Sequence, residues 1–178
     1  MDNQNTLQLL DANQIERLVE KLYKKNNNPN EIKEIDTYLR SLVIISNIEL
    51  FKNIFFSCKS MNSTIFAANS LRIILTNHSH LVEIQHYVDI FEFILNLIKN
   101  KSSELLIKRE LTNTSIHLLC KITRIYYLSE NQKIKNIVNY LLEISNNSTN
   151  NSQRKLVYMT FTELIYNFKT LDFNDNIK

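Results

Sequence analysis

The stretch Asn28-Pro29-Asn30-Glu31 precedes an apolar stripe at helical spacing, which consists of Ile32, Ile35, Leu39 and Leu42. Asparagine is a preferred N-cap, and proline is tolerated in the first helical turn. A glutamate three residues after a cap completes a capping box. The stretch therefore predicts a helix that begins at the only proline of the chain.

Glycine is absent from all 178 residues. An average protein contains about 7% glycine, and tight hairpins and bulges depend on it because it reaches positive φ without steric cost. Helices joined by asparagine and serine need no glycine, so we predict an all-α fold. Phosphate-binding loops and nucleophile elbows, which are built on glycine, are excluded.

Composition points to one globular domain without nucleic-acid or membrane partners. Hydrophobic residues make up 44% and charged residues 22%, and the net charge of +3 is spread without basic blocks. No apolar run approaches the roughly 18 residues of a membrane span, and residues 1–5 lack the features of a signal peptide. We therefore expect no membrane insertion, and we expect Cys58 and Cys120 to be reduced thiols in a cytosolic or nuclear protein.

Helical periodicity continues from residue 15 to residue 168. Asp11 and Gln14 form a capping box before the first stripe, and Asn47 is the expected cap of the third helix. Ser129 and Gln132 are expected to form a capping box at the start of the helix that follows. The stripes besides the one quoted above are Ile15, Leu18, Val19 and Leu22; Ile48, Phe51, Ile54, Phe55 and Cys58; Ile65, Ala68, Leu71 and Leu75; Ile84, Tyr87, Val88, Phe91, Ile94, Leu95 and Ile98; Ile107, Leu111, Leu118, Ile122 and Ile125; Ile134, Ile137, Val138, Leu141 and Ile144; and Val157, Phe161, Leu164, Ile165 and Phe168.

These helices fall into four pairs within a single helical-repeat segment, 1–178. The pairs span 11–46, 47–77, 79–128 and 129–168, and residues 169–178 are expected to fray. The first helices of the pairs start near residues 14, 47, 82 and 132, at spacings of 33, 35 and 50 residues. Helix pairs that recur every 40–47 residues or so suggest HEAT repeats, and pairs at about 34 suggest tetratricopeptide repeats, whose core needs the glycine and tryptophan that this chain lacks. We therefore predict an α-α superhelix, a HEAT/armadillo-like solenoid of about four antiparallel pairs. A closed bundle of seven or eight helices is the alternative that periodicity does not exclude.

Few residues suggest chemistry, and we predict no enzyme activity, cofactor or metal. His78, His80 and His86 suggest zinc, but no cysteine is nearby and a solvated loop is the preferred interpretation. Cys120 and His117 suggest a nucleophile pair, but no acid orients the histidine, so Cys120 is expected to be a buried structural thiol. The tyrosine pair 126–127 is assigned to core packing rather than to base stacking.

The polar faces of the second helices are the candidate partner-binding residues. In a helical solenoid such faces line the concave wall that partners occupy, although an ordinary solvated face is the alternative for each residue. The candidates are Asn69, Arg72, Arg109, Asn113, His117, Lys121 and Arg124.

Several segments resemble the importin-β/exportin superfamily, the karyopherins. Ser63–Leu75 (STIFAANSLRIIL) resembles the inner helix of the second repeat, with its F-A-A core followed by leucine. Leu118–Leu128 is similar to the inner helix of repeat three, and its I-T-R segment followed by aromatics leans toward the exportin-7 class. Tyr87–Ile98 and Ile15–Tyr23 resemble the next outer helix and the opening helix.

The resemblance implies the N-terminal HEAT repeats of a nuclear export receptor. Such a segment binds the GTP-bound small GTPase Ran through its inner helices, carries protein cargo through the nuclear pore, and occurs in nucleus and cytoplasm. As part of a longer array, it is expected to expose apolar residues at its C-terminal end and to self-associate through them. The alternative function is a freestanding helical scaffold that does not bind Ran.

Overall fold

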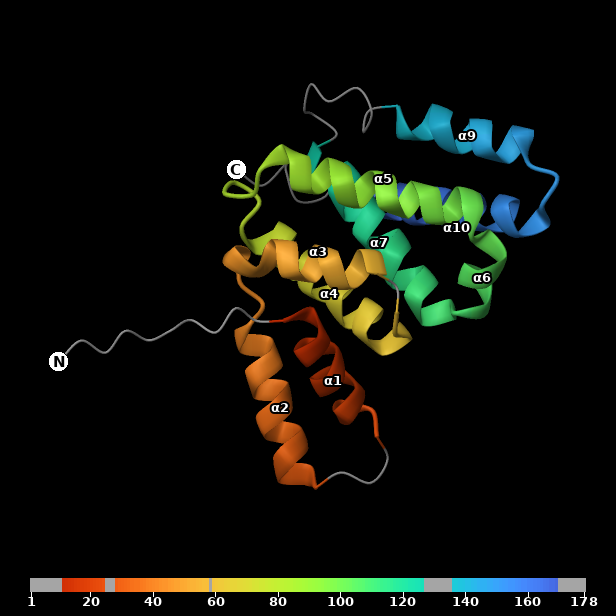
Figure 1. The fold of residues 1–178 in the computed structure, drawn as a ribbon. Coiled ribbons are helices and arrows are strands. Elements are labelled where there is room, and N and C mark those ends of the chain that lie inside the picture. Colours follow the sequence, from red (N-terminus) through yellow and green to blue (C-terminus); the bar gives the residue numbers. More distant parts are fainter. Residues whose placement is uncertain (1–10, 25–27, 58, 127–135, 170–178) are drawn as a thin grey trace.

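The computed structural model describes residues 11–24, 28–57, 59–126 and 136–169, and every structural statement below concerns these residues. Within them the secondary structure is helical throughout (Figure 1). The elements are α1 (Ala12–Leu22), α2 (Pro29–Ser41), the 3₁₀ turn η1 (Ile45–Asn47), α3 (Ile48–Ser57), α4 (Met61–Asn77), α5 (Ile84–Asn100), α6 (Ser102–Ile107), α7 (Arg109–Tyr126), α9 (Ile137–Asn147) and α10 (Asn151–Lys169).

The helices form a HEAT-like solenoid of four antiparallel pairs: α1 with α2, α3 with α4, α5 with α7, and α9 with α10 (Figure 1). The second helices α4, α7 and α10 make one layer, because α7 packs on α4 and α10 packs on α7. The first helices α3, α5 and α9 make the other layer. The first and last pairs do not pack substantially on each other, so the array is open rather than a closed bundle.

The first pair is arranged differently from the other three. Helix α1 packs on both α3 and α4, whereas α2 packs mainly on α1 and projects from the body (Figure 1). A polar contact orients α1, because the Glu20 carboxylate accepts hydrogen bonds from the side chains of Ser60 and Asn62 at the start of α4. A carboxylate at a helix N-terminus is favoured by the helix dipole. This contact therefore helps to place the first pair on the second.

Two of the predicted caps are confirmed. The Asp11 side chain accepts a hydrogen bond from Asn13 N, and Asn28 accepts one from Asn30 N with Pro29 in the first turn. The cap predicted at Asn47 is wrong. Asn47 ends η1, and its Nδ2 donates to the Leu42 carbonyl, so it closes the turn after α2 instead of capping α3.

Some stripe residues lie outside the core. Ile107 is 85% exposed because α6 ends there and Lys108 adopts a non-helical ψ of 66°, which interrupts the helix predicted to run through both. Ile84 begins α5 and is largely exposed. Val138 of α9 and Ile165 of α10 lie on the outer side of the last helix pair, where they are about half exposed.

The predicted boundaries differ slightly from the helices. The predicted division at 46/47 falls inside η1, and Lys169, assigned to a frayed tail, belongs to α10. The rest of that tail and the box predicted at Ser129 and Gln132 lie outside the described residues. Among the described helices, no segment combines the length and the hydropathy needed to cross a bilayer.

Candidate protein-interaction surface

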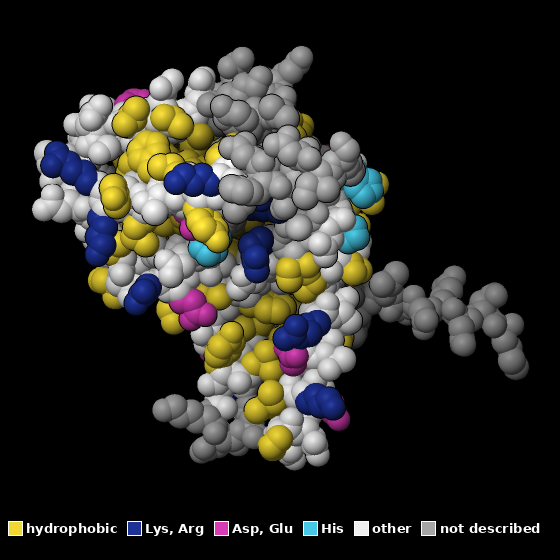
Figure 2. All heavy atoms as spheres, turned by 180° about the vertical axis from the view of Figure 1, so that it is seen from behind, with side chains coloured by type: hydrophobic (Ala, Val, Ile, Leu, Met, Phe, Trp, Pro, Cys, Tyr) yellow, Lys and Arg dark blue, Asp and Glu magenta, His cyan; other side chains and the backbone are white. Residues whose placement is uncertain are grey.

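The candidate residues lie on the exposed side of the second-helix layer, the α4–α7–α10 face. Helix α4 packs against α1, α3 and α7, which buries most of its residues and leaves a narrow polar strip. On this strip Arg72 is exposed and Asn69 is half-buried. Figure 2 shows this side of the molecule, with basic side chains scattered over it and hydrophobic side chains between them. Acidic side chains are fewer there.

Helix α7 supplies the other five candidates. Arg109, Asn113 and His117 are exposed, and Lys121 and Arg124 are half-buried. A helix rises 1.5 Å per residue, so Arg109 and Arg124 are separated by roughly 22 Å along α7. The candidates therefore form a long strip rather than one compact site. Arg109 lies at one end of α7, and Lys121 and Arg124 lie at the other.

The structure brings Arg72, Lys121 and Arg124 together, and these three residues are the basic cluster of the face. Partial burial lowers the pKa of Lys121, and the charges of Arg124 and Arg72 lower it further. Two cations from different helices therefore act on the same ammonium group. No ion pair among the described residues involves any of the three.

His117 does have an acidic partner, which sequence reasoning missed. Its Nε2 lies 3.6 Å from Oε2 of Glu163 on α10. The other carboxylate oxygen of Glu163 accepts a hydrogen bond of 2.8 Å from Asn167 Nδ2. The contact of His117 with Glu163 joins α7 to α10 on the exposed face. These two residues are 46 positions apart in the sequence, so no local pattern indicates their contact.

Cys120 does not pair with His117. Its side chain is fully buried and its Sγ lies 3.9 Å from the Thr160 carbonyl, whereas His117 points to the exposed face. Burial raises the pKa of the Cys120 thiol, and the charge of Glu163 raises it further. A buried, protonated thiol is unreactive. The prediction of a buried thiol at Cys120 is confirmed, and Cys58 lies outside the described residues.

A buried polar cluster joins α3 to α5, and sequence reasoning missed it. Lys52 is 5% exposed, and its Nζ donates hydrogen bonds to Asp89 Oδ2 at 2.7 Å and to Glu49 Oε1 at 3.0 Å. Nδ1 of His86 lies 3.3 Å from Lys52 Nζ and 3.1 Å from Glu49 Oε1. The one local feature that could have indicated this cluster is the position of Lys52, next to the apolar Phe51 in a mainly apolar helix.

The pKa values of this cluster follow from its geometry. Burial lowers the pKa of Lys52, but the hydrogen bonds and charges of Asp89 and Glu49 outweigh burial and raise it. The Lys52 hydrogen bond lowers the pKa of Asp89, and a second hydrogen bond from Gln85 Nε2 also lowers it. Both groups are therefore held in their charged forms. The cluster is an ion network that ties α3 to α5.

The other residues with suggested chemistry are also structural in their described contacts. His86 is part of the polar cluster, and no group of three His, Cys, Asp or Glu side chains among the described residues is placed to hold a metal. The rings of Tyr126 and Tyr87 pack edge to face, with centroids 4.4 Å apart. Tyr127 lies outside the described residues.

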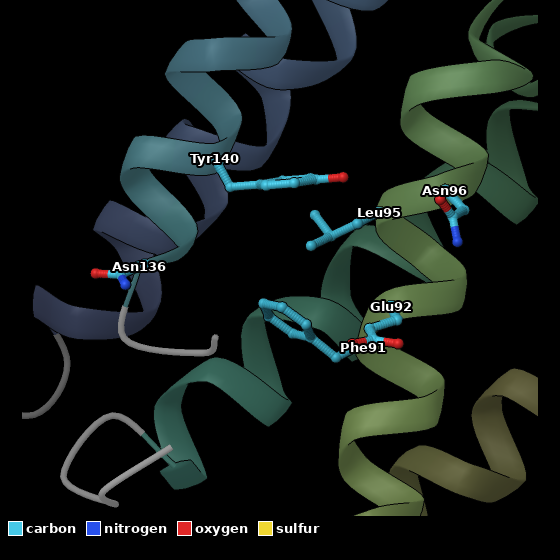
Figure 3. A pocket seen from close by; sticks show the side chains of 6 residues that line it. All are labelled: Phe91, Glu92, Leu95, Asn96, Asn136 and Tyr140. Atoms are coloured by element: carbon cyan, nitrogen blue, oxygen red, sulfur yellow. The ribbon is translucent and has the colours of Figure 1, made fainter. Parts of the chain in front are cut away.

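A pocket of about 480 Å³ separates α5 from α9 in the first-helix layer. Tyr140 extends from α9 toward Leu95 of α5, and Phe91 points into the same space, while Glu92 and Asn96 leave α5 in other directions (Figure 3). Between α3 and α5, by contrast, the rings of Phe55 and Phe93 pack edge to face and fill the space between the two helices. The pocket thus results from a looser approach of the last pair.

A second, more apolar pocket of about 370 Å³ lies at the C-terminal end of the array. Two helices of the last pair and the end of α7 form it. It is lined by Thr123, Ile137, Val138, Phe161, Leu164, Ile165 and Phe168. We call this pocket the end groove. Val138 and Ile165 are about half exposed in it, whereas Thr123, Ile137 and Leu164 are buried.

Comparison with known proteins leaves the family open. No protein-family model matches the chain, and searches of curated proteins and of solved structures found no similar one. The resemblance to the importin-β/exportin superfamily therefore stays a prediction from the sequence. The candidate partner-binding roles of Asn69, Arg72 and the five residues of α7 likewise stay predictions.

Proposed function

We propose that this chain is the N-terminal HEAT-repeat segment of an exportin-like transport receptor. In this role it binds the GTP-bound form of the small GTPase Ran through its second helices and takes part in the transport of protein cargo between nucleus and cytoplasm. The proposal rests on the resemblance of residues 63–75 and 118–128 to karyopherin inner helices. One structural observation supports it.

That observation is the α4–α7–α10 face. The segments that carry the resemblance lie on α4 and α7, which pack side by side in the second-helix layer. In stacked helical repeats one layer provides an extended surface for a partner. Here that surface carries the exposed Arg72 and Arg109 and the half-buried Lys121. A charged, continuous strip suits a protein partner better than a small-molecule substrate.

Nucleotide-dependent binding of Ran tests the proposal. The immobilised chain is expected to retain Ran loaded with a non-hydrolysable GTP analogue and not Ran loaded with GDP. Replacing Asn113 and His117 with alanine should weaken retention, because both side chains lie on the exposed strip of α7. Alanine at Tyr23 and Tyr38, which are exposed on the first pair, is the matched control. Equal retention of both nucleotide forms, or none, contradicts the proposal.

The freestanding scaffold that does not bind Ran is the alternative function. Self-association is a separate expectation, which follows from a segment of a longer array, and the end groove is the surface for it. We propose that two copies of the chain pair through this groove. Helix α7 covers α4 and α10 covers α7, but the outer side of the last pair exposes Ile165 of α10 to 56% and Val138 of α9 to 48%. A second copy presents the same strip, so symmetric pairing covers both.

Light scattering is expected to show a mass that rises with protein concentration. Ile165→Lys should hold the protein monomeric, because a lysine at this position cannot be covered by an apolar surface without a large desolvation cost. Leu81→Lys is the matched control, since Leu81 is 59% exposed between α4 and α5, away from the groove. A monomeric parent chain at high concentration contradicts pairing, as does equal self-association of both variants.

A further inference from the structure

The basic cluster of Arg72, Lys121 and Arg124 has a defined structural origin. Lys121 and Arg124 are three positions apart on α7, so their side chains leave the same side of the helix. Arg72 comes from α4, which packs directly on α7. It is exposed, while the two α7 residues are half-buried. The cluster therefore combines three positive charges from two helices on one accessible surface.

The charges of this cluster are not balanced within the described part of the protein. Like charges at this spacing repel, and the pKa of Lys121 is lowered by partial burial and by its two basic neighbours. Glu163 is the one acidic residue of α10, and it faces His117 instead. The cluster lowers stability slightly unless an anionic group from outside occupies it.

An exposed aromatic side chain lies at the same level of the face. The helices α7 and α10 are the second helices of consecutive pairs, so they run in the same direction. Lys121 lies one turn beyond His117, and Tyr166 lies one turn beyond Glu163, the partner of His117. Tyr166 is 67% exposed. Helix geometry therefore puts the exposed ring of Tyr166 on α10 near the level of Lys121, where an apolar side chain of a ligand can cover it.

We propose that the basic cluster binds an acidic peptide segment that also carries apolar side chains. Carboxylates would be held by the fork of Arg72 or Arg124 and by the ammonium group of Lys121, and an apolar side chain would cover Tyr166. The inference names the chemistry of a partner for the face in the proposed function, but it requires no GTPase. It assigns the C-terminal half of the α7 strip to this role and leaves Arg109 outside it.

Fluorescence anisotropy with a defined peptide tests the inference. The probe is a labelled peptide of four Asp-Glu-Leu repeats, and its neutral counterpart consists of four Asn-Gln-Leu repeats. The full chain is expected to bind the acidic probe and not the neutral one. Replacing Arg72, Lys121 and Arg124 with glutamine should weaken binding by roughly tenfold or more, because three charge pairs with the peptide are lost.

A variant of equal net charge separates the cluster from general attraction. Glutamine at Lys33, Lys59 and Lys155, which are exposed and lie elsewhere, removes the same three charges. It should weaken binding less than threefold. Equal weakening in both variants, or no binding of the acidic probe by the parent chain, overturns the inference. Retention of GTP-loaded Ran is measured in a separate experiment. Loss of Ran binding and loss of acidic-peptide binding can therefore be told apart.

Discussion

Replacing Ala68 with phenylalanine is expected to lower the free energy of unfolding by about 3 kcal/mol or to prevent folding. Ala68 is fully buried on α4, together with the neighbouring Ala67. Helix α4 packs against α1, α3 and α7, so an added ring has no free space to enter. Overpacking at such a site forces side chains from their rotamers and separates the helices.

Thermal unfolding measures this effect. For a chain of this length about 3 kcal/mol corresponds to a decrease in Tm of roughly 6–12 °C. The control is Arg72→Phe, which places the same ring on the same helix at an exposed position. It removes one of three repelling charges and should leave Tm nearly unchanged. Identical Tm values for the parent chain and Ala68→Phe would show that α4 is rotated relative to its neighbours.

Replacing Asp89 with alanine is expected to cost about 3 kcal/mol, because the buried Lys52 ammonium loses its shortest hydrogen bond. Glu49 remains, but its side chain is 60% exposed and holds the ammonium less closely. Lys52→Met should cost much less. It leaves carboxylates that can turn to water, whereas Asp89→Ala leaves a buried charge. Chemical denaturation of both variants and of the double variant measures this asymmetry.

The pH dependence of the same variants gives a second measurement. The pKa of Asp89 is lowered in the folded state, mainly by its hydrogen bond with Lys52, so its stabilising contribution is fully present above the unfolded value of about 3.9. It is lost as the pH falls through the lower folded value. The difference in stability between the parent chain and Asp89→Ala should therefore shrink below about pH 4. A difference that is constant down to pH 2 contradicts the ion network.

Local sequence patterns predicted most of the helices, although they missed the break between α6 and α7. The caps at Asp11 and Asn28 and the stripe of Ile65, Ala68, Leu71 and Leu75 are interactions between residues one to ten positions apart. The apolar stripe follows the 3.6-residue period of a helix, and this period does not depend on the rest of the chain. For the same reason, the sequence could indicate the solvent-facing strip of α7 but not which residues of α4 and α10 lie beside it.

The tertiary structure decided everything that depends on a second helix. The sequence gives no sign that Lys52 is buried, because its partner Asp89 lies 37 positions away on α5. His117 contacts Glu163 because α10 packs on α7. Arg72 joins Lys121 and Arg124 in the same way, through the contact of α4 with α7. The absence of glycine and the helical periodicity determined that the chain is all-α. The order of packing determined which charges meet, because electrostatic and hydrogen-bond contacts act over a few ångströms in space and not along the sequence.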